Sequence, residues 1–309
     1  MAKQTFNPDN VMLQDMKTGQ IPSESAEIIL KDTMTQSAVM QLAKFEPMTK
    51  PVKEFTYLAE GPGAYWVDEG ERIQTSKATW LTAKMEAKKL GVILPVSKEF
   101  LRYSVSDFFR IMGPEIAEAF YTKFDQAVLF GKETPYKAES IFDLATKSGN
   151  LVEEGTNTNL YLDLNDLMAA VEDGDYDPNG FTTTRRFRHK LRGAVDTNNL
   201  PIFNDPRQGE TASALGLPIS YIDKKSFDYE KAALFTGDWD YARYGILQGI
   251  EFAISEDATL TTIKDGQGND VNLFERDMFA LRATMHVAYA PLAEDAFAVL
   301  TPAKESVGE

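Results

Sequence analysis

The residues best suited to chemistry form a basic cluster in an otherwise acidic chain. Its members are Arg185, Arg186, Arg188, His189, Lys190 and Arg192. Converging cations of this kind bind phosphate groups or an acidic protein surface. The simpler alternative is a solvated helix face whose cations pair with neighbouring acids, and the sequence favours it. The other histidine, His286, is distant along the chain, so no histidine metal site is predicted.

A second group combines carboxylates with aromatic rings. Asp68, Glu69 and Glu71 closely follow Tyr65 and Trp66. A carboxylate pair beside an aromatic platform is typical of a polysaccharide hydrolase. Adjacent acids at the tip of a predicted hairpin are explained more simply as a soluble tip or as one half of a salt bridge between subunits. We therefore expect subunit contacts here, with further candidates at Arg72, Lys77 and Trp80.

The usual motifs of catalytic, cofactor and metal sites are missing from the sequence. It has no cysteine, which excludes disulfides, thiolate metal sites and cysteine nucleophiles. It has no phosphate-binding glycine loop with a lysine, no G-x-S-x-G and no H-E-x-x-H. Residues 265–270 resemble a calcium loop only loosely, because Arg276 stands where a bidentate glutamate is expected. We predict no catalytic residue, no cofactor and no metal.

Composition narrows the class of protein further. With 309 residues and 43% hydrophobic content, the chain is long enough for two globular domains. Its formal net charge of -15 argues against a protein whose main role is to hold nucleic acid. No apolar run reaches the length of a membrane span, and the start of the chain lacks the pattern of a secretory signal. We expect a soluble chain that is synthesised in a cytoplasm.

The elements that position the hairpin residues lie within residues 55–131. The period of the hydrophobic residues changes midway through this stretch. The first part alternates apolar and polar residues around turn-forming glycines, which predicts a half-buried hairpin. The second part repeats apolar residues every four positions, which predicts a long helix that Gly131 ends. Pro114 either kinks this helix or begins its main part. An isolated hairpin is marginal in water, so we expect another copy of the chain to cover it.

The flanking segments predict shorter elements. Residues 1–22 form an arm, residues 25–45 contain one or two brief helical turns, and Pro95 indicates an edge strand or the end of a strand. Residues 132–159 are a turn-rich crossing to an α/β domain over about 140–255, which begins with a helix capped by Asp163 or Asn165. That domain includes a strand at 181–184 and a helix ending at Gly193. The chain then returns to strands, with a hairpin turn at 265–270 and helix or strand left open near Arg276.

Several stretches together carry a resemblance to a known family. They read FNPDNVM, PGAYWVDEGERIQTSKATW, LGVILPVSKEFL, IAEAFYTKFD and VNLFERDMFALRATMHVA. In these stretches and in the order of its elements, the chain resembles the major capsid proteins of tailed bacteriophages with the Hong Kong 97 fold. It is most similar to those of phages of Gram-positive bacteria. Residues 140–235 match the family least well.

The resemblance implies an α+β fold with an N-terminal arm, an extended β-hairpin loop, a peripheral domain with a long spine helix, and an axial α/β domain. The implied segments are 1–52 for the arm and short helices, 53–95 for the extended loop, 96–139 for the peripheral domain with its spine helix, 140–255 for the axial domain, and 256–309 for the returning peripheral strands and tail. Lys77 and Lys84 are the hairpin lysines that correspond to crosslinking positions in some relatives, although no matching motif supports a crosslink here.

The implied function is assembly into the icosahedral head shell that encloses the double-stranded DNA of a tailed phage, with no reaction catalysed. The implied partners are other copies in hexamers and pentamers, a scaffolding protein and a portal during assembly, and packaged DNA, with no membrane. The protein would reside in the virion after synthesis in the host cytoplasm. Arg185, Arg186, Arg188 and Arg192 would serve subunit contacts first and genome contact second. The alternatives are a nucleic-acid-binding module that uses residues 185–192 and a polysaccharide hydrolase.

Overall fold

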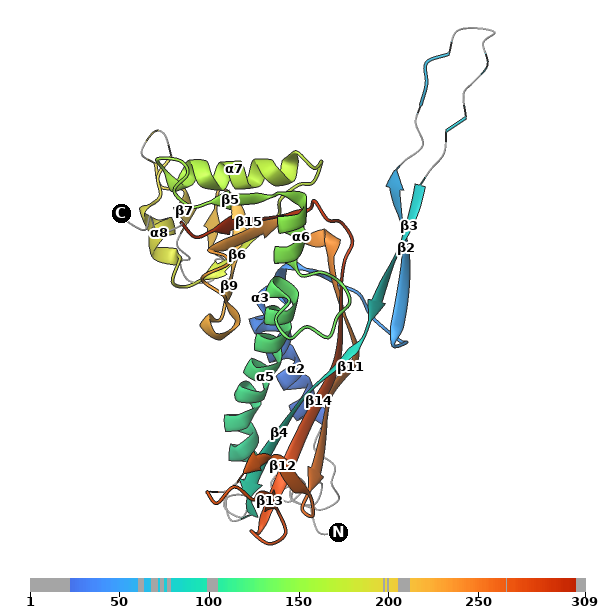
Figure 1. Ribbon diagram of the computed structural model, residues 1–309, viewed down its shortest axis with the longest axis vertical. Coiled ribbons are helices and arrows are strands. Elements are labelled where there is room, and N and C mark those ends of the chain that lie inside the picture. The colour runs from blue at the N-terminus through green and yellow to red at the C-terminus, as the bar shows by residue number, and fades with distance from the viewer. Residues whose placement is uncertain are drawn as a thin grey trace, which may run out of the picture.

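Helices pack on two main β-sheets, as the predicted α+β class requires (Figure 1). The computed structural model describes residues 23–60, 64–67, 72, 75–76, 79–98, 105–196, 198, 200–204, 212–264 and 266–303. Only the backbone is described at 23–26, 57–60, 79–81 and 105–111. The predicted arm at residues 1–22 lies outside the described residues.

The first sheet has four strands in the order β1-β11-β14-β4. These are β1 (Lys44–Phe45), β11 (Ala242–Ser255), β14 (Met278–Pro291) and β4 (Lys88–Ser97). Pro95 lies on β4, which is an edge strand, so its missing N–H costs no ladder hydrogen bond and the edge prediction is confirmed. The question left open near Arg276 is also answered, because β14 begins at Met278.

The long predicted helix is α5 (Val105–Phe130), which packs across this sheet (Figure 1). Its repeating apolar residues are buried, including Ile116, Phe120, Phe124 and Val128. Alternate residues of β14, such as Phe279, Leu281 and Met285, belong to the same core. The helix runs through Pro114, and Gly131 ends it with a positive φ of 65°.

Two helices from the N-terminal part lie against α5. They are α2 (Ser23–Gln36) and α3 (Ala38–Leu42), separated at Ser37. The prediction of only brief turns over 25–45 was wrong in length, since α2 alone spans 14 residues. Ile29 of α2 is buried in the same core as α5, and such tertiary packing stabilises a helix whose own periodic signal is weak.

The second sheet has seven strands in the order β5-β15-β10-β6-β9-β8-β7. They are β5 (Leu151–Glu153), β15 (Phe297–Thr301), β10 (Leu234–Gly237), β6 (Gly180–Thr184), β9 (Leu217–Ile222), β8 (Ser213–Ala214) and β7 (Phe203–Asn204). The helices α7 (Leu160–Glu172) and α8 (Arg188–Gly193) pack against this sheet. Leu164, Leu167 and Leu191 belong to its apolar core. The predicted strand at 181–184 and the helix ending at Gly193 are confirmed.

The structure corrects two predictions in this half of the chain. The supposed turn-rich crossing at 132–159 contains the helix α6 (Ile141–Ser148) and strand β5. The N-cap of α7 is Asn159, whose side chain accepts a hydrogen bond from the N–H of Tyr161, and not Asp163 or Asn165. Asp163 is instead buried, where it accepts hydrogen bonds from the N–H groups of Gly155 and Asn157 at 2.8 and 2.9 Å.

Strands from different predicted segments share one sheet. Most of β4 lies in the predicted extended loop of 53–95, and β11 lies in the predicted axial segment of 140–255, and both pair with β14. Strand β15, which was expected among the returning peripheral strands, pairs with β10 and β5 in the seven-stranded sheet. Long-range pairing decides these memberships, and sequence distance does not.

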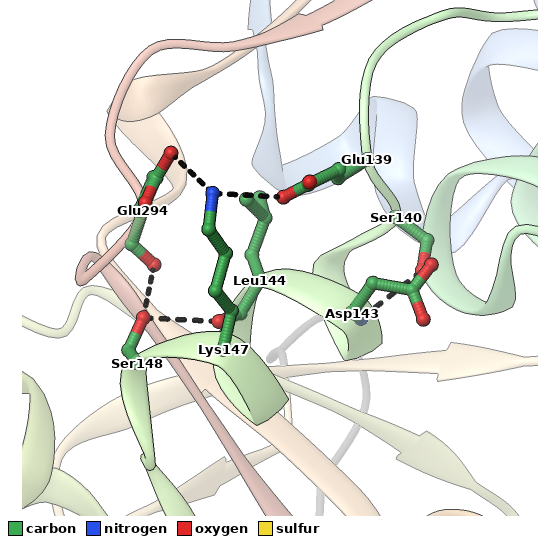
Figure 2. A network of polar contacts seen from close by, with 7 residues as sticks. All are labelled: Glu139, Ser140, Asp143, Leu144, Lys147, Ser148 and Glu294. Carbon is green, nitrogen blue, oxygen red and sulfur yellow. Dashed lines mark hydrogen bonds and ion pairs between the residues drawn. The ribbon is translucent and has the colours of Figure 1, made fainter.

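A polar network fixes the connection through which the chain passes from β14 to β15 (Figure 2). Lys147 of α6 lies 2.8 Å from Glu294 and 3.6 Å from Glu139. Ser148 donates a hydrogen bond to the backbone carbonyl of Glu294 at 2.9 Å. These contacts hold α6 against the connecting loop between the two sheets.

Two antiparallel hairpins, one short and one long, complete the described fold. β12 (Thr259–Lys264) and β13 (Asp270–Asn272) flank the predicted turn at 265–270, whose first residue, Asp265, lies outside the described residues. β2 (Val52–Glu60) and β3 (Thr79–Glu86) form the predicted long hairpin, which projects from the body (Figure 1). No helix in the described part of the chain is long and apolar enough to cross a membrane.

Candidate functional site

The projecting hairpin exposes the aromatic residues that the sequence singled out. Trp66 is 104% exposed and Tyr65 is 52% exposed, and Arg72 is exposed as well. Trp80 lies on β3, with only its backbone described, whereas Asp68, Glu69, Glu71 and Lys77 lie outside the described residues. Large exposed aromatic rings on a projecting hairpin are candidates for contact with another molecule.

The base of the hairpin is anchored to the four-stranded sheet. Glu46, which follows β1, forms ion pairs with Lys53 of β2 at 2.9 Å and with Arg243 of β11 at 2.8 Å. Met85 of β3 is fully buried in a small core with Met48. Farther out, Lys84 and Glu54 pair across the strands at 2.8 Å in an exposed position. The hairpin is thus fixed at one end and extends outward from there.

The basic cluster is a turn followed by the short helix α8, which buried Phe187 and Leu191 attach to the seven-stranded sheet. Two of its arginines lie against aromatic rings. Arg186 stacks on Tyr229 with the guanidinium carbon 5.1 Å from the ring centroid, and Arg188 lies 5.8 Å from the ring of Tyr221.

The predicted pairing with acids is present at Lys190. Lys190 forms an ion pair with Glu154 at 2.5 Å, as expected for a solvated helix face. Nδ1 of His189 lies 2.6 Å from the carbonyl oxygen of Arg186. Arg185, Arg186 and Arg192 are exposed, and Arg188 is half-buried.

A groove of about 800 Å³ lies beside this cluster, between the seven-stranded sheet and the helices α2, α3 and α5. Its walls come from the ends of β6 and β9, from α2 and α3, and from Tyr121 of α5. Arg185, Arg186 and Lys224 are its cations, and Asp223 is its acid. A second hollow of about 310 Å³ shares Arg186 and Tyr229 with the groove. We call the larger hollow the basic groove.

The sequence predicted neither the groove nor its residues Lys224 and Tyr229, because their approach to Arg186 depends on the packing of β9 beside β6. It also missed Asp125, a fully buried carboxylate on α5. A signal for Asp125 was present: it lies four residues after Tyr121 and three before Val128, on the face of the helix that is otherwise apolar.

Two titratable side chains of α5 have shifted pKa values. Burial raises the pKa of Asp125 to about 7, although hydrogen bonds from Ser37, Ala38 and Val39 act in the opposite direction. Burial also raises the pKa of Tyr121 to about 12, with nearby carboxylates adding to the effect. Among the described residues, no group of three or more histidine or acidic side chains could hold a metal ion.

Residues 19–301 match the Phage capsid family. The chain belongs to this family. The resemblance seen in the sequence is therefore confirmed, and the protein is a structural component of a virion.

Individual capsid proteins agree with this assignment over nearly the whole chain. The major capsid protein of Staphylococcus phage 80alpha is 45% identical over 301 residues, covering 97% of this chain and 90% of that protein. A solved structure from Microbacterium phage Oxtober96 has a TM-score of 0.71 at 30% identity, covering 86% of this chain and 91% of that one. This protein therefore functions as a major capsid protein of a tailed phage.

The fold of more distant particles is the same. The capsid of an empty GTA particle, with C5 symmetry, has a TM-score of 0.64 at 14% identity, covering 87% of this chain and 90% of that one. The Hong Kong 97 type of fold expected from the sequence is confirmed by these structural neighbours. Membership of a family of structural proteins also agrees with the expectation that the capsid protein is not an enzyme.

Proposed function

We propose that this capsid protein builds an icosahedral head shell from hexamers and pentamers, using the β2–β3 hairpin as its principal clamp on neighbouring copies. The observation that carries the proposal is the hairpin itself. It leaves the body as an isolated two-stranded ribbon and carries a fully exposed Trp66 (Figure 1). Such a ribbon is marginal in water by itself, so an assembled neighbour supplies its missing partner surface.

The two sheets suggest a division of labour within the shell. We assign the four-stranded sheet and α5 to the peripheral part of each subunit, and the seven-stranded sheet with α7 and α8 to an axial part that clusters around the capsomer axis. Because β11 and β15 each pair with strands of the other predicted segment, this division follows the sheets and replaces the boundaries at 95 and 255.

The packaged genome is double-stranded DNA in this proposal, and the net charge of -15 limits how strongly the shell attracts it. A scaffolding protein and a portal act during assembly in the host cytoplasm. The dispersed partners of the basic cluster, with Arg186 on Tyr229 and Lys190 on Glu154, support structural contacts over a dedicated nucleic-acid interface. The hydrolase alternative is set aside because the chain belongs to a family of structural capsid proteins.

A truncated hairpin tests the proposal. Glu60 and Thr79 are paired residues of β2 and β3, so residues 61–78 can be replaced by Asn-Gly, which closes a two-residue turn. We expect the full chain to form shells, tubes or capsomer rings in negative-stain electron microscopy, and the truncated chain to remain small while unfolding at the same temperature. Shells of normal size and yield from the truncated chain would contradict the proposed role of the hairpin.

A further inference from the structure

The basic groove gathers three cations, Arg185, Arg186 and Lys224, around one hollow. Several other described cations form ion pairs with acids, among them Lys53, Lys84, Lys88, Lys98, Lys123, Lys147, Lys190 and Arg243. Lys225, directly after Lys224, pairs with Glu118. Arg185, Arg186 and Lys224 are exposed, and none of them has an acidic partner among the residues that the structure describes. In a chain of net charge -15, three unpaired cations around one hollow form a local binding site for negative charge.

The geometry of the groove suits carboxylates. Arg186 is held over the face of Tyr229 at 5.1 Å, which leaves the edge of the guanidinium plane available for a bidentate contact. Asp223, the one acid among the described residues that line the groove, is an N-cap that accepts a hydrogen bond from the N–H of Lys225 at 3.1 Å. Partial enclosure between strand β9 and the helices α2, α3 and α5 weakens solvent screening, so an ion pair here is stronger than on an open surface.

The chain itself contains a matching acidic segment. Asp68, Glu69 and Glu71 follow the exposed Trp66 in the connection between β2 and β3. This hairpin projects on one side of the molecule, whereas α8 and β9, which border the basic groove, lie on the other side (Figure 1). We therefore expect the acidic segment to meet the basic groove of a different copy.

We propose that residues 68–71 of one subunit bind in the basic groove of a neighbouring subunit, where their carboxylates pair with Arg185, Arg186 and Lys224. The inference rests on the proposed clamp and specifies its receptor. Three carboxylates facing three cations fix the register of the hairpin on its neighbour. Because the contact is electrostatic, added salt weakens it more than it weakens the apolar contacts of Trp66.

Charge reversal tests this pairing. We expect the variant R185E/R186E/K224E to lower the yield of shells at least about tenfold, and D68K/E69K/E71K to do the same. When both sets are combined in one chain, complementarity returns and we expect a yield within about threefold of the wild type. A matched control, K50E/K89E/K132E, changes the net charge equally at exposed lysines outside the groove and leaves the yield unchanged.

The combined variant separates a lost contact from a folding defect, since a misfolded groove variant is not rescued by reversing the hairpin. If the wild type assembles and each reversed variant assembles equally well, the groove is not the receptor, although the proposed function stands. If the groove variant forms normal shells that hold less DNA, the groove binds the genome and the inference is overturned. If the wild type itself forms no assembly, the proposed function fails first.

A covalent test uses the absence of cysteine from the chain. In the double variant E69C/R185C, any disulfide joins the two introduced positions or two copies of one of them. We expect mild oxidation of assembled shells to give a ladder of linked subunits, which the single variants and the control E69C/K132C do not give. Intact shells of E69C/R185C without such a ladder would overturn the proposal.

Discussion

The carboxylate of Asp125 on α5 accepts a 2.6 Å hydrogen bond from the hydroxyl of Ser37, and both side chains are buried. The same carboxylate accepts hydrogen bonds from the N–H groups of Ala38 and Val39 at 3.1 and 3.4 Å. Ser37 is the N-cap of α3, where its hydroxyl also accepts the N–H of Met40 at 3.1 Å. One carboxylate on α5 thus accepts hydrogen bonds from the free backbone N–H groups at the start of α3, which is far away in the sequence.

Removing this carboxylate will destabilise the subunit. In D125A, the hydroxyl of Ser37 and two backbone N–H groups lose their buried acceptor, so we expect the free energy of unfolding to fall by about 2 to 4 kcal/mol. Urea unfolding of the unassembled subunit measures the change. The control E27A, at an exposed residue of α2, should change stability by no more than about 0.5 kcal/mol, and an equal effect of the two variants would contradict the prediction.

The stability of the subunit will depend on pH through the same residue. Burial raises the pKa of Asp125 to about 7 in the folded chain, above the value of about 3.9 expected when unfolded, so the folded state binds the proton more tightly. Its contribution is complete below about pH 4 and is lost as the pH rises towards 7, by up to about 1.4 kcal/mol per pH unit. D125N lacks this titration.

The measurement compares the free energies of unfolding of wild type and D125N between pH 4 and 8. The difference between them should shift in favour of D125N as the pH rises to about 7, and should then stay constant. Parallel profiles for the two proteins would show that the carboxyl titrates near its ordinary pKa.

Gly237 is required by close packing in the seven-stranded sheet. A Cβ at this position would lie 2.4 Å from the carbonyl oxygen of Ala296 and 2.6 Å from the ring of Phe297. We expect G237A to lower the free energy of unfolding by about 1 to 3 kcal/mol, because the buried strands must move apart. Gly193, where an added Cβ meets nothing within 4 Å, is the control, and thermal unfolding of G193A should match the wild type.

Trp66 is expected to matter for assembly and not for the fold of the subunit. Its side chain is 104% exposed, so W66A should change the unfolding free energy of the isolated subunit by less than about 0.5 kcal/mol. If its ring is an anchor at the subunit contact, the concentration needed for assembly rises at least about tenfold. Light scattering against concentration measures this, and unchanged assembly would remove Trp66 from the interface.

The double ion pair of Glu46 is expected to orient the hairpin. In E46Q, Lys53 and Arg243 both lose a charged partner, at a cost of about 1 kcal/mol because the pairs are only partly buried. We expect slower assembly from the loosened hairpin base. The control E54Q removes the exposed cross-strand partner of Lys84 and should leave the assembly rate unchanged, so equal slowing in both variants would contradict an orienting role for Glu46.

Local patterns by themselves predicted the elements whose signals repeat within a few residues. The four-residue spacing from Phe108 to Val128 and the glycine at 131 defined α5 to within a residue or two. Alternation and turn residues located the β2–β3 hairpin, and Pro95 indicated an edge strand. Exposed aromatic and charged residues in the hairpin already indicated a surface for another copy.

Tertiary structure decided which distant segments meet. Periodicity shows that 297–301 is a strand, but only packing places β15 between β10 and β5 in the sheet away from β14. The same is true of Asp125, whose role as an acceptor depends on α3 lying against α5, and of the basic groove, which exists only where β6, β9 and α5 come together. Hydrophobic period is a property of neighbouring residues, whereas sheet order, buried hydrogen bonds and grooves depend on long-range contacts that no local pattern encodes.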